Sequence, residues 1–444
     1  MKLTRLLIAA AILAVLGGVM WWSNRDEKAK EGKSTDTSPK ILTLKEEGIQ
    51  QIDIKPRTGE VTSLKKTNGR WSITAPQPMK ADDSAVASIT SAVSNLSADR
   101  IVDEHATDLP SYGLDPALVA LTFTDASGKA TVLKFGEDTP TGSDAYAVTD
   151  GDPRLYTVFT ATKGMFNKGW KDLREKHLIT FNTDKLSRVE LDVPGKPLIE
   201  FGRSGPNDWQ ILKPKTMRAD SFQVEQLTGK AKSTLLDPDV DPQKAAAGFA
   251  SAQRVATVRI TGDEGLLSIE IRKNKDDVYA KSSQVAGIYK VNKDAADDLA
   301  KNLDDFRNKK LFDFGFSDPT RIEFRDGAQG GAKTSAWDKS GDKWTSGGKN
   351  IDPVSVQNLI DKLRDVSATK FTEGVSAPPT VEITVVSDSG KRTEKVKIAA
   401  SGPAFVASRD GDDSQYQLDA ETVNGLRQAA ADVKEDTSKP GGKK

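Results

Sequence analysis

The sequence has 444 residues and carries 64 Lys and Arg against 64 Asp and Glu, so its formal net charge at pH 7 is zero. A chain of this length is expected to form several domains, and its balanced charge argues against a nucleic-acid-binding surface. It contains no Cys, which excludes disulfides, thiol chemistry and a cysteine-linked lipid anchor and is consistent with an oxidising compartment.

The N-terminus has the pattern of a membrane-spanning helix. Lys2 and Arg5 precede an uncharged run, residues 6–22, that closes with two Trp residues. A helix of about 17–25 apolar residues crosses a bilayer, and indole rings favour its interface. We therefore predict a single-pass membrane anchor at residues 6–22, with Lys2 and Arg5 on the cytoplasmic side and the bulk of the chain outside. The family resemblance described below implies that this membrane is the bacterial inner membrane and that the bulk of the chain is periplasmic. The alternative is a cleaved signal peptide, but the side chains at 19–22 are bulky where cleavage needs small ones.

Beyond the anchor, the chain repeats one unit three times. Trp71, Trp209 and Trp344 recur at intervals of 138 and 135 residues, and the same elements surround each of them. The predicted division is an anchor at 1–22, a polar linker at 23–40, repeat domains at 41–181, 182–314 and 315–436, and a disordered tail at 437–444.

Each unit is expected to contain the same series of elements. An alternating strand is followed by the Trp strand, and then by a helix that begins at an Asp cap. A hairpin with a Gly-containing turn and two short aromatic strands come next, and a closing helix ends the unit. The first helix starts near Asp82, Asp220 and Asp352. The closing stripes are Phe166-Trp170-Leu173, Leu299-Leu303-Phe306 and Leu426-Ala430-Val433. The predicted fold is thus α+β, as three tandem repeats of a mostly antiparallel sheet with two helices each, after one transmembrane helix.

A search for catalytic chemistry finds little. The two His residues, His105 and His177, lack the spacing of a metal site. Asp237 to Asp241 resembles the start of a calcium loop, but Pro242 and Gly248 replace the glycine and glutamate that such a loop requires. We interpret that segment as a Pro-stiffened connection. No phosphate loop, dinucleotide fingerprint or nucleophile elbow is present in the sequence. We predict a protein without a cofactor, a bound metal or an enzymatic activity.

Two loop motifs in the first repeat are the best candidates for binding. Tyr112-Gly113-Leu114-Asp115-Pro116 precedes the hairpin, and the segment from Gly136 to Gly142 follows it. Turn formation explains such residues equally well, whereas loops are also where binding residues concentrate. The second and third repeats keep only Gly248-Phe249 and Gly374-Val375 at the first motif. The candidate partner or ligand residues are Tyr112, Gly113, Asp115, Gly136, Asp138, Thr139 and Gly142.

These motifs resemble the bacterial domain-of-unknown-function 4340 family. The resemblance also includes Tyr146-Ala147-Val148, Leu155-Tyr156-Thr157-Val158 and the run from Leu173 to Leu178. It covers most of residues 41–436 and is clearest in the first repeat. It implies an envelope accessory protein that works with a gliding-motility-type ABC transporter, contacting its permease and its substrate-binding-like subunit. It supplies no catalytic residues.

Three functions remain open on sequence alone. The first is a non-catalytic binding or scaffold protein that docks on such a transporter, because the repeats share apolar and turn positions but no polar triad. The second is an envelope hydrolase, which would need two carboxylates converging in a cleft. The third is a structural spacer in the envelope, and fold alone does not choose among them.

Overall fold

The computed structural model describes residues 38–206, 208–327 and 333–437. No helix within these ranges is long and apolar enough to cross a membrane. The predicted anchor at 6–22 and most of the predicted linker and tail lie outside the described residues.

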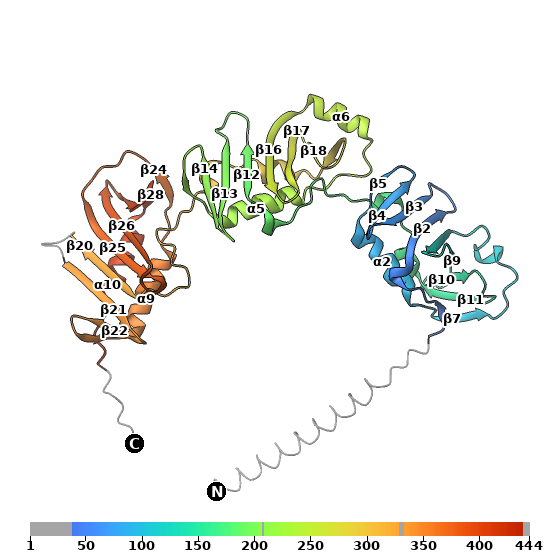
Figure 1. Cartoon of the computed structure of the whole chain (residues 1–444), viewed down its shortest axis with the longest axis horizontal. Coiled ribbons are helices and arrows are strands. Elements are labelled where there is room, and N and C mark those ends of the chain that lie inside the picture. Colours follow the sequence, from blue (N-terminus) through green and yellow to red (C-terminus); the bar gives the residue numbers. More distant parts are fainter. Residues whose placement is uncertain (1–37, 207, 328–332, 438–444) are drawn as a thin grey trace, which may run out of the picture. The chain divides into compact units, whose positions relative to one another are not determined.

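The chain is α+β and its sheets are antiparallel, so the predicted fold class is confirmed at this level. It forms two compact units that divide between Glu175 and Lys176. The first unit holds one large sheet and the second holds two (Figure 1). We call them the first, second and third sheets.

Within the described residues the three sheets share the order of eight strands, and the first and third add a ninth strand, β7 or β24, at one edge. In each, the first long strand is central and pairs on one side with the Trp hairpin and on the other with the second hairpin. The first sheet runs, in spatial order, β5 (Met79–Lys80), β4 (Arg70–Ala75), β3 (Thr62–Thr67), β2 (Ile49–Pro56), β8 (Val119–Asp125), β9 (Ala130–Asp138), β10 (Asp144–Thr149), β11 (Leu155–Phe159) and β7 (Arg100–Asp103). A separate small sheet pairs β1 (Lys40–Leu42) with β6 (Leu96–Ser97).

The other two sheets lie in the second unit. The second sheet runs β15 (Met217–Arg218), β14 (Asp208–Lys213), β13 (Ile199–Gly205), β12 (Arg188–Asp192), β16 (Gln253–Gly262), β17 (Gly265–Asn274), β18 (Asp277–Ser282) and β19 (Ile288–Val291). The third runs β23 (Lys349–Ile351), β22 (Lys343–Ser346), β21 (Lys333–Ser340), β20 (Arg321–Asp326), β25 (Pro379–Ser387), β26 (Arg392–Ser401), β27 (Ala404–Arg409), β28 (Asp412–Leu418) and β24 (Lys370–Thr372).

Each sheet packs its apolar face into a core of its own. The first core extends from Ile41 to Leu173, the second from Leu178 to Phe306, and the third from Leu311 to Leu426. Residues 174–177 and 307–310, which follow the first two closing helices and are rich in Lys and Arg, therefore carry the chain from one core into the next. Burial of alternating apolar side chains on one face is what fixes the register of these strands.

The three repeated Trp residues are equivalent and buried, as predicted. Trp71, Trp209 and Trp344 lie on β4, β14 and β22, which occupy the same place in the three sheets, and their exposed fractions are 7%, 3% and 4%. The first long helix of each repeat contacts that strand. The helices are α2 (Asp83–Ser94), α5 (Ser221–Lys232) and α9 (Pro353–Asp365), and Figure 1 shows α5 against the face of the second sheet.

A cation stands opposite each of these Trp residues, which the sequence analysis did not anticipate. The cross-strand partners are Lys66, Arg203 and Lys339. Their charged ends lie 5.7, 5.5 and 5.9 Å from the indole centres, which is the range of a cation–π contact. Each cation thus lies over the ring of its Trp, and the guanidinium of Arg203 also donates to the carbonyl oxygens of Thr183 and Asp184.

The helix starts follow the sequence prediction. Asp82, Asp220 and Asp352 are the N-cap residues of α2, α5 and α9, and each carboxylate accepts hydrogen bonds from backbone N–H groups of the first turn. Such a cap satisfies donors that have no partner inside the helix. Pro353 occupies the first turn of α9, where its missing N–H costs nothing.

The prediction of two helices per repeat is wrong for the first two repeats, because their closing helix is broken. It divides into α3 (Thr160–Phe166) and α4 (Trp170–Leu173), and into α7 (Asp294–Leu299) and α8 (Leu303–Phe306). The second piece begins with a new cap, since the N–H of Gly169 donates to Asp172 and that of Asn302 to Asp305. In the third repeat α10 (Ala420–Ala431) is continuous and ends in a run of Ala.

Asp237 to Asp241 form a connection outside any helix or strand, as interpreted, but the helix that follows was not predicted. Asp241 caps a helix, α6 (Pro242–Ser251), with Pro242 in its first turn. This is the same start signal that was read correctly for α9. The matching of Gly248-Phe249 to the first-repeat loop fails as a result, because both residues lie inside α6. Gly374 does match Gly113, since both adopt positive φ, at 74° and 67°.

Candidate functional site

The structure brings the two predicted loops of the first repeat together. Arg57 joins them, donating from one guanidinium nitrogen to the carbonyl oxygen of Gly113 at 2.8 Å and from another to Glu137 at 2.7 Å. Gly136 lies so close to the other loop that a Cβ there would be 2.1 Å from the carbonyl oxygen of Tyr112. Gly113 and Gly136 are therefore explained by close backbone packing.

The predicted side chains divide into packed and exposed groups. Tyr112 is half-buried and packs edge-on against Tyr146, with ring centroids 4.7 Å apart. Both belong to a small apolar cluster around Leu114. Thr139 is buried, whereas Asp115, Asp138 and Gly142 are exposed. Asp138 forms an ion pair with the buried Lys163 of α3, so Asp115 has the freest polar side chain of the set.

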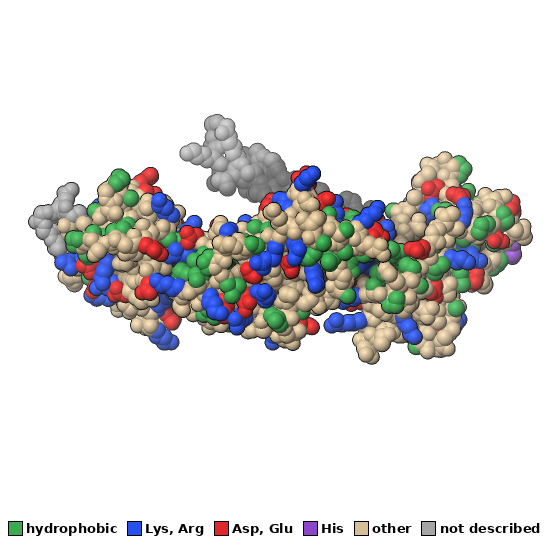
Figure 2. Space-filling model, turned by 90° about the horizontal axis from the view of Figure 1, so that it is seen from above, with side chains coloured by type: hydrophobic (Ala, Val, Ile, Leu, Met, Phe, Trp, Pro, Cys, Tyr) green, Lys and Arg blue, Asp and Glu red, His purple; other side chains and the backbone are tan. Residues whose placement is uncertain are grey.

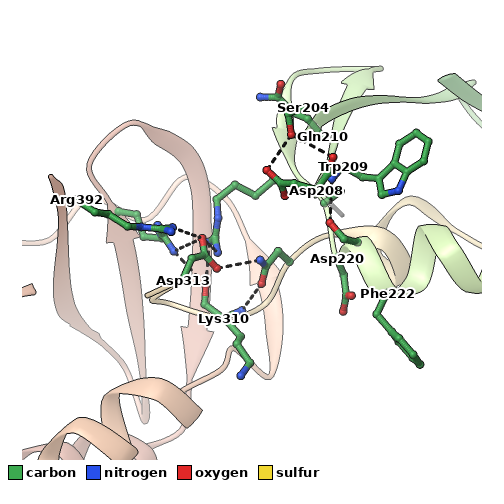
Figure 3. Close-up of a pocket in the computed structure, with 14 residues that line it drawn as sticks. Ser204, Asp208, Trp209, Gln210, Asp220, Phe222, Lys310, Asp313 and Arg392 are labelled. Atoms are coloured by element: carbon green, nitrogen blue, oxygen red, sulfur yellow. Dashed lines mark hydrogen bonds and ion pairs between the residues drawn. The ribbon is translucent and has the colours of Figure 1, made fainter. Parts of the chain in front are cut away.

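A larger opening lies in the second unit, between the second and third sheets. It is a cleft of about 770 Å³, and none of its lining residues was predicted from the sequence to bind a ligand, since Trp209 and Asp220 were named there only as positions of the repeat. One wall comes from the second sheet and the start of α5, and the other from the third sheet and the segment leading into it (Figure 3). The first wall includes Ser204, Asp208, Gln210 and Phe222, and the second includes Lys310, Asp313, Arg392 and Arg409.

Arg218 crosses from the second sheet to the third. From β15 it donates to the carbonyl oxygen of Lys310 at 2.9 Å, to the hydroxyl of Tyr416 at 3.0 Å and to the carboxylate of Asp313 at 2.5 Å. Its side chain is only 20% exposed. A guanidinium offers five donors in a fixed fork, so one side chain can hold several acceptors in place.

The acceptors on the third sheet form a network among themselves. The carboxylate of Asp313 also accepts from Asn308 at 3.1 Å and from Arg409 at 3.3 Å. Glu394 accepts from Arg409 at 3.0 Å and from the backbone N–H of Asp313 at 2.8 Å. Charge-assisted hydrogen bonds of this kind are among the strongest in proteins, and low exposure strengthens them further.

Tyr416 and Asp412 complete the network. The Tyr416 hydroxyl donates to Asp412 at 2.5 Å, and Arg218 lies 3.8 Å from the same carboxylate. Burial, only partly opposed by Arg218 and reinforced by the bond to Asp412, raises the pKa of Tyr416 to about 12. Burial alone would raise the pKa of Asp412, but the hydrogen bonds from Tyr416 and Ser414 and the charge of Arg218 outweigh it and lower the pKa.

The raised pKa of Tyr416 predicts a loss of stability in alkali. A free tyrosine has a pKa of about 10, so this group contributes fully to stability below pH 10. The contribution disappears as the pH rises through the folded-state pKa of about 12. We expect the free energy of unfolding of the second unit to fall between these values, and to fall less in Tyr416→Phe. Urea unfolding of both proteins at several pH values in this range measures the difference. If the free energy of unfolding falls equally with pH in both, the raised pKa does not belong to Tyr416.

The Tyr416–Asp412 pair has a counterpart in the first sheet, where the Tyr156 hydroxyl donates to Asp152 at 2.6 Å, but Arg409 has no charged counterpart in the other two sheets. Arg409 stands opposite Val396 on β26. The equivalent cross-strand places hold Thr149 opposite Leu133, and Ser282 opposite Ile269. The part of the network that includes Arg409 is therefore specific to the third sheet, whereas the Tyr–Asp hydrogen bond also occurs in the first. A sequence signal existed, because Glu394 shares the alternating buried face of β26 with Val396 and Ile398.

In the part of the chain that the structure describes, no group of three or more His, Asp or Glu side chains could hold a metal ion. His105 is exposed, and His177 forms a β-bridge with Leu235. The predicted calcium-like segment supplies the cap of α6, through the carboxylate of Asp241.

Comparison with known families supports the repeat on independent grounds. The family described as "Domain of unknown function (DUF4340)" matches residues 71–237 and again residues 209–384. The chain belongs to the DUF4340 family. Each of the two DUF4340 matches begins at a repeated Trp, Trp71 or Trp209, and the second reaches into the third sheet. A comparison with curated proteins gave no match.

Proposed function

We propose that this DUF4340 protein is a non-catalytic accessory protein, held in the bacterial inner membrane by residues 6–22 and working in the periplasm. Its proposed partners are the permease and the substrate-binding-like subunit of a gliding-motility-type ABC transporter. The anchor and the compartment rest on the charge and hydropathy of the first 22 residues. The partners rest on the family resemblance.

One observation carries the non-catalytic part of the proposal. The carboxylates that line the cleft of about 770 Å³ are each engaged by local donors: Asp208 by the hydroxyl of Ser204, Asp220 by the N–H of Gln223, and Asp313 by Arg218, Asn308 and Arg409. A carboxylate hydrolase needs one acid held protonated, with a raised pKa. The carboxyl groups whose pKa is displaced in the described residues are displaced downward: Asp125, Asp152, Asp277, Asp412 and Asp419.

The mixed surface is also suited to protein partners. On the face in Figure 2, basic and acidic side chains are interspersed with apolar ones. Such a surface offers paired charges to another protein, whereas a nucleic-acid-binding face concentrates positive charge.

A crosslinked pull-down from membranes tests the proposed partnership. We expect the permease and the substrate-binding-like subunit to co-purify with the full-length chain after mild crosslinking. Activity of the purified chain on an envelope polymer, without those subunits, would favour the hydrolase. Recovery of neither a partner nor an activity would favour the spacer.

The anchor gives a separate prediction. The full-length protein is expected to remain in the membrane pellet after a high-salt wash, because about 17 apolar residues inserted in a bilayer are not displaced by ions. A chain that begins at residue 24 is the control and should be soluble. A mature species cut near residue 22 and recovered from the soluble periplasm would show a cleaved signal instead.

A further inference from the structure

A small apolar pocket lies in the second repeat, between the start of α8 and the loop that joins β12 to β13. Its volume is about 250 Å³. The pocket is lined by Val193, Lys196, Pro197, Ile199, Pro214, Lys301, Asn302 and Leu303. Val193 and Ile199 are buried, whereas Pro197 and Pro214 are exposed. The floor of the pocket is therefore part of the core, and its rim is open to solvent.

The first repeat fills the equivalent place with a side chain of its own. Trp170 begins α4 as Leu303 begins α8, and its indole N–H donates to Glu60 at 2.8 Å. Glu60 lies in the loop between β2 and β3, which corresponds to the loop of Lys196 and Pro197 in the second repeat. The first repeat thus closes this gap with an aromatic ring that is bonded to a carboxylate. The second repeat has a smaller Leu and a Lys-bearing loop there, and the gap remains as a pocket.

The pocket in the second repeat carries positive charge. Among the described residues that line it there is no Asp or Glu, and there are two Lys. Lys196 donates to the side-chain oxygen of Asn302, and Lys301 makes no ion pair or hydrogen bond within the described part of the chain. The acids of α8, Asp304 and Asp305, already accept hydrogen bonds from their own turn. Because an ammonium group has three donors, both Lys side chains can still bind an incoming anion.

The size of the pocket favours a single side chain over a free small molecule. Sites for small molecules usually have volumes of about 300–1,000 Å³, and this pocket is smaller. Aromatic side chains are the characteristic anchors of protein interfaces, where each fills a pocket on the partner. The two Lys residues add a preference for an aromatic residue that has Asp or Glu beside it.

We propose that this pocket binds an aromatic side chain of a partner protein, with a neighbouring carboxylate of the partner held by Lys196 and Lys301. The proposal rests on the proposed binding function and names its docking point. The bound group reproduces, between two proteins, the pair that Trp170 and Glu60 form inside the first repeat. Burial of the aromatic side chain supplies most of the affinity, and the two Lys residues select the residue beside it.

Calorimetric titration of the full-length chain with the peptide N-acetyl Ser-Trp-Glu-Ser amide tests the pocket. We expect saturable binding at millimolar concentration. Peptides with Ala in place of Trp, or with Gln in place of Glu, should bind more weakly. Added salt should weaken the Glu peptide more than the Gln peptide, because only the former uses the exposed Lys charges.

Leu303→Trp closes the pocket from within, as Trp170 does in the first repeat. We expect this substitution to weaken peptide binding about tenfold or more, since the new ring takes the place in which the ligand buries its apolar surface. Leu266→Trp is the matched control. Leu266 is 64% exposed near the start of β17 and does not line the pocket, so we expect the affinity to stay within about twofold.

Lys301→Gln tests the charge while leaving the apolar walls intact. We expect the Glu peptide to bind about two- to fivefold more weakly, which is the range for one exposed ion pair, and the Gln peptide to be unaffected. Lys281→Gln is the control, because Lys281 is exposed on β18 and does not line the pocket. It should leave the affinity of both peptides unchanged.

Absence of peptide binding at millimolar concentration, or equal binding by Leu303→Trp, would overturn the proposal. Two other occupants would also overturn it. Binding of laurate but not of the peptide would assign the pocket to an amphiphile, and a dimer that Leu303→Trp dissociates would assign it to a second copy of the chain.

The result is separable from that of the pull-down. Co-purification of transporter subunits without peptide binding would reject the pocket alone. Peptide binding that Leu303→Trp abolishes, without co-purification, would support the pocket and reject the transporter partnership alone.

Discussion

Truncating Arg218 to Ala is expected to lower the free energy of unfolding of the second unit by about 2–4 kcal/mol. The side chain is 20% exposed and donates to Asp313, Tyr416 and the carbonyl oxygen of Lys310. Its removal leaves acceptors on the third sheet with fewer hydrogen-bond partners. The free-energy penalty of a buried acceptor without a partner is larger than the net contribution of the hydrogen bond that was lost. Calorimetry of the full-length chain would show the effect on the transition of the second unit.

Lys215→Ala is the matched control for Arg218→Ala. Lys215 lies in the turn between β14 and β15 and also reaches the third sheet, 3.4 Å from Asp413. Its side chain is 58% exposed and that of Asp413 is 80% exposed, and pairs so exposed contribute about 0–1 kcal/mol. If both variants lose the same stability, the cross-sheet network has no special role.

The largest expected effect belongs to the repeated Trp. Trp344→Ala should lower the stability of the second unit by about 3–5 kcal/mol, as for other large core truncations. Trp344 is 4% exposed and belongs to the core of the third sheet, where α9 contacts its strand. Ala would leave a cavity that the surrounding sheet and helix can fill only in part.

Phe316→Ala is the control for the loss of an aromatic side chain. Phe316 is 95% exposed, so its removal should change the free energy of unfolding by at most about 0.5 kcal/mol. The transition of the first unit provides an internal reference, because neither residue belongs to it. A similar shift for both variants would mean that burial of Trp344 is not what stabilises this sheet.

The positions that repeat along the chain were readable from the sequence. Trp71, Trp209 and Trp344, the three Asp caps and the alternating strands depend on local periodicity, and periodicity alone decides which side chains share a face. The breaks in the closing helices were missed because the apolar residues keep helical spacing on both sides of Gly169 and of Asn302. The new helix starts at these two residues therefore leave no mark on the apolar pattern. Helix α6 was missed because Asp241, its cap, also ends the Asp-rich run from Asp237, whose alternating carboxylates are typical of a loop.

The candidate site depended on the tertiary structure. The contact between Arg57 and Glu137 joins residues 80 apart, and the contact between Arg218 and Tyr416 joins residues 198 apart. Nothing in the local pattern of either side chain specifies such a partner, because these contacts arise only after complete sheets have folded and docked. Glu394 was the one readable clue, as a carboxylate on the buried face of an alternating strand. A buried charge requires a partner, so the strand pattern is enough to predict that Glu394 is paired. That its partner is Arg409 follows only from the packing of the third sheet, because the two residues lie on different strands.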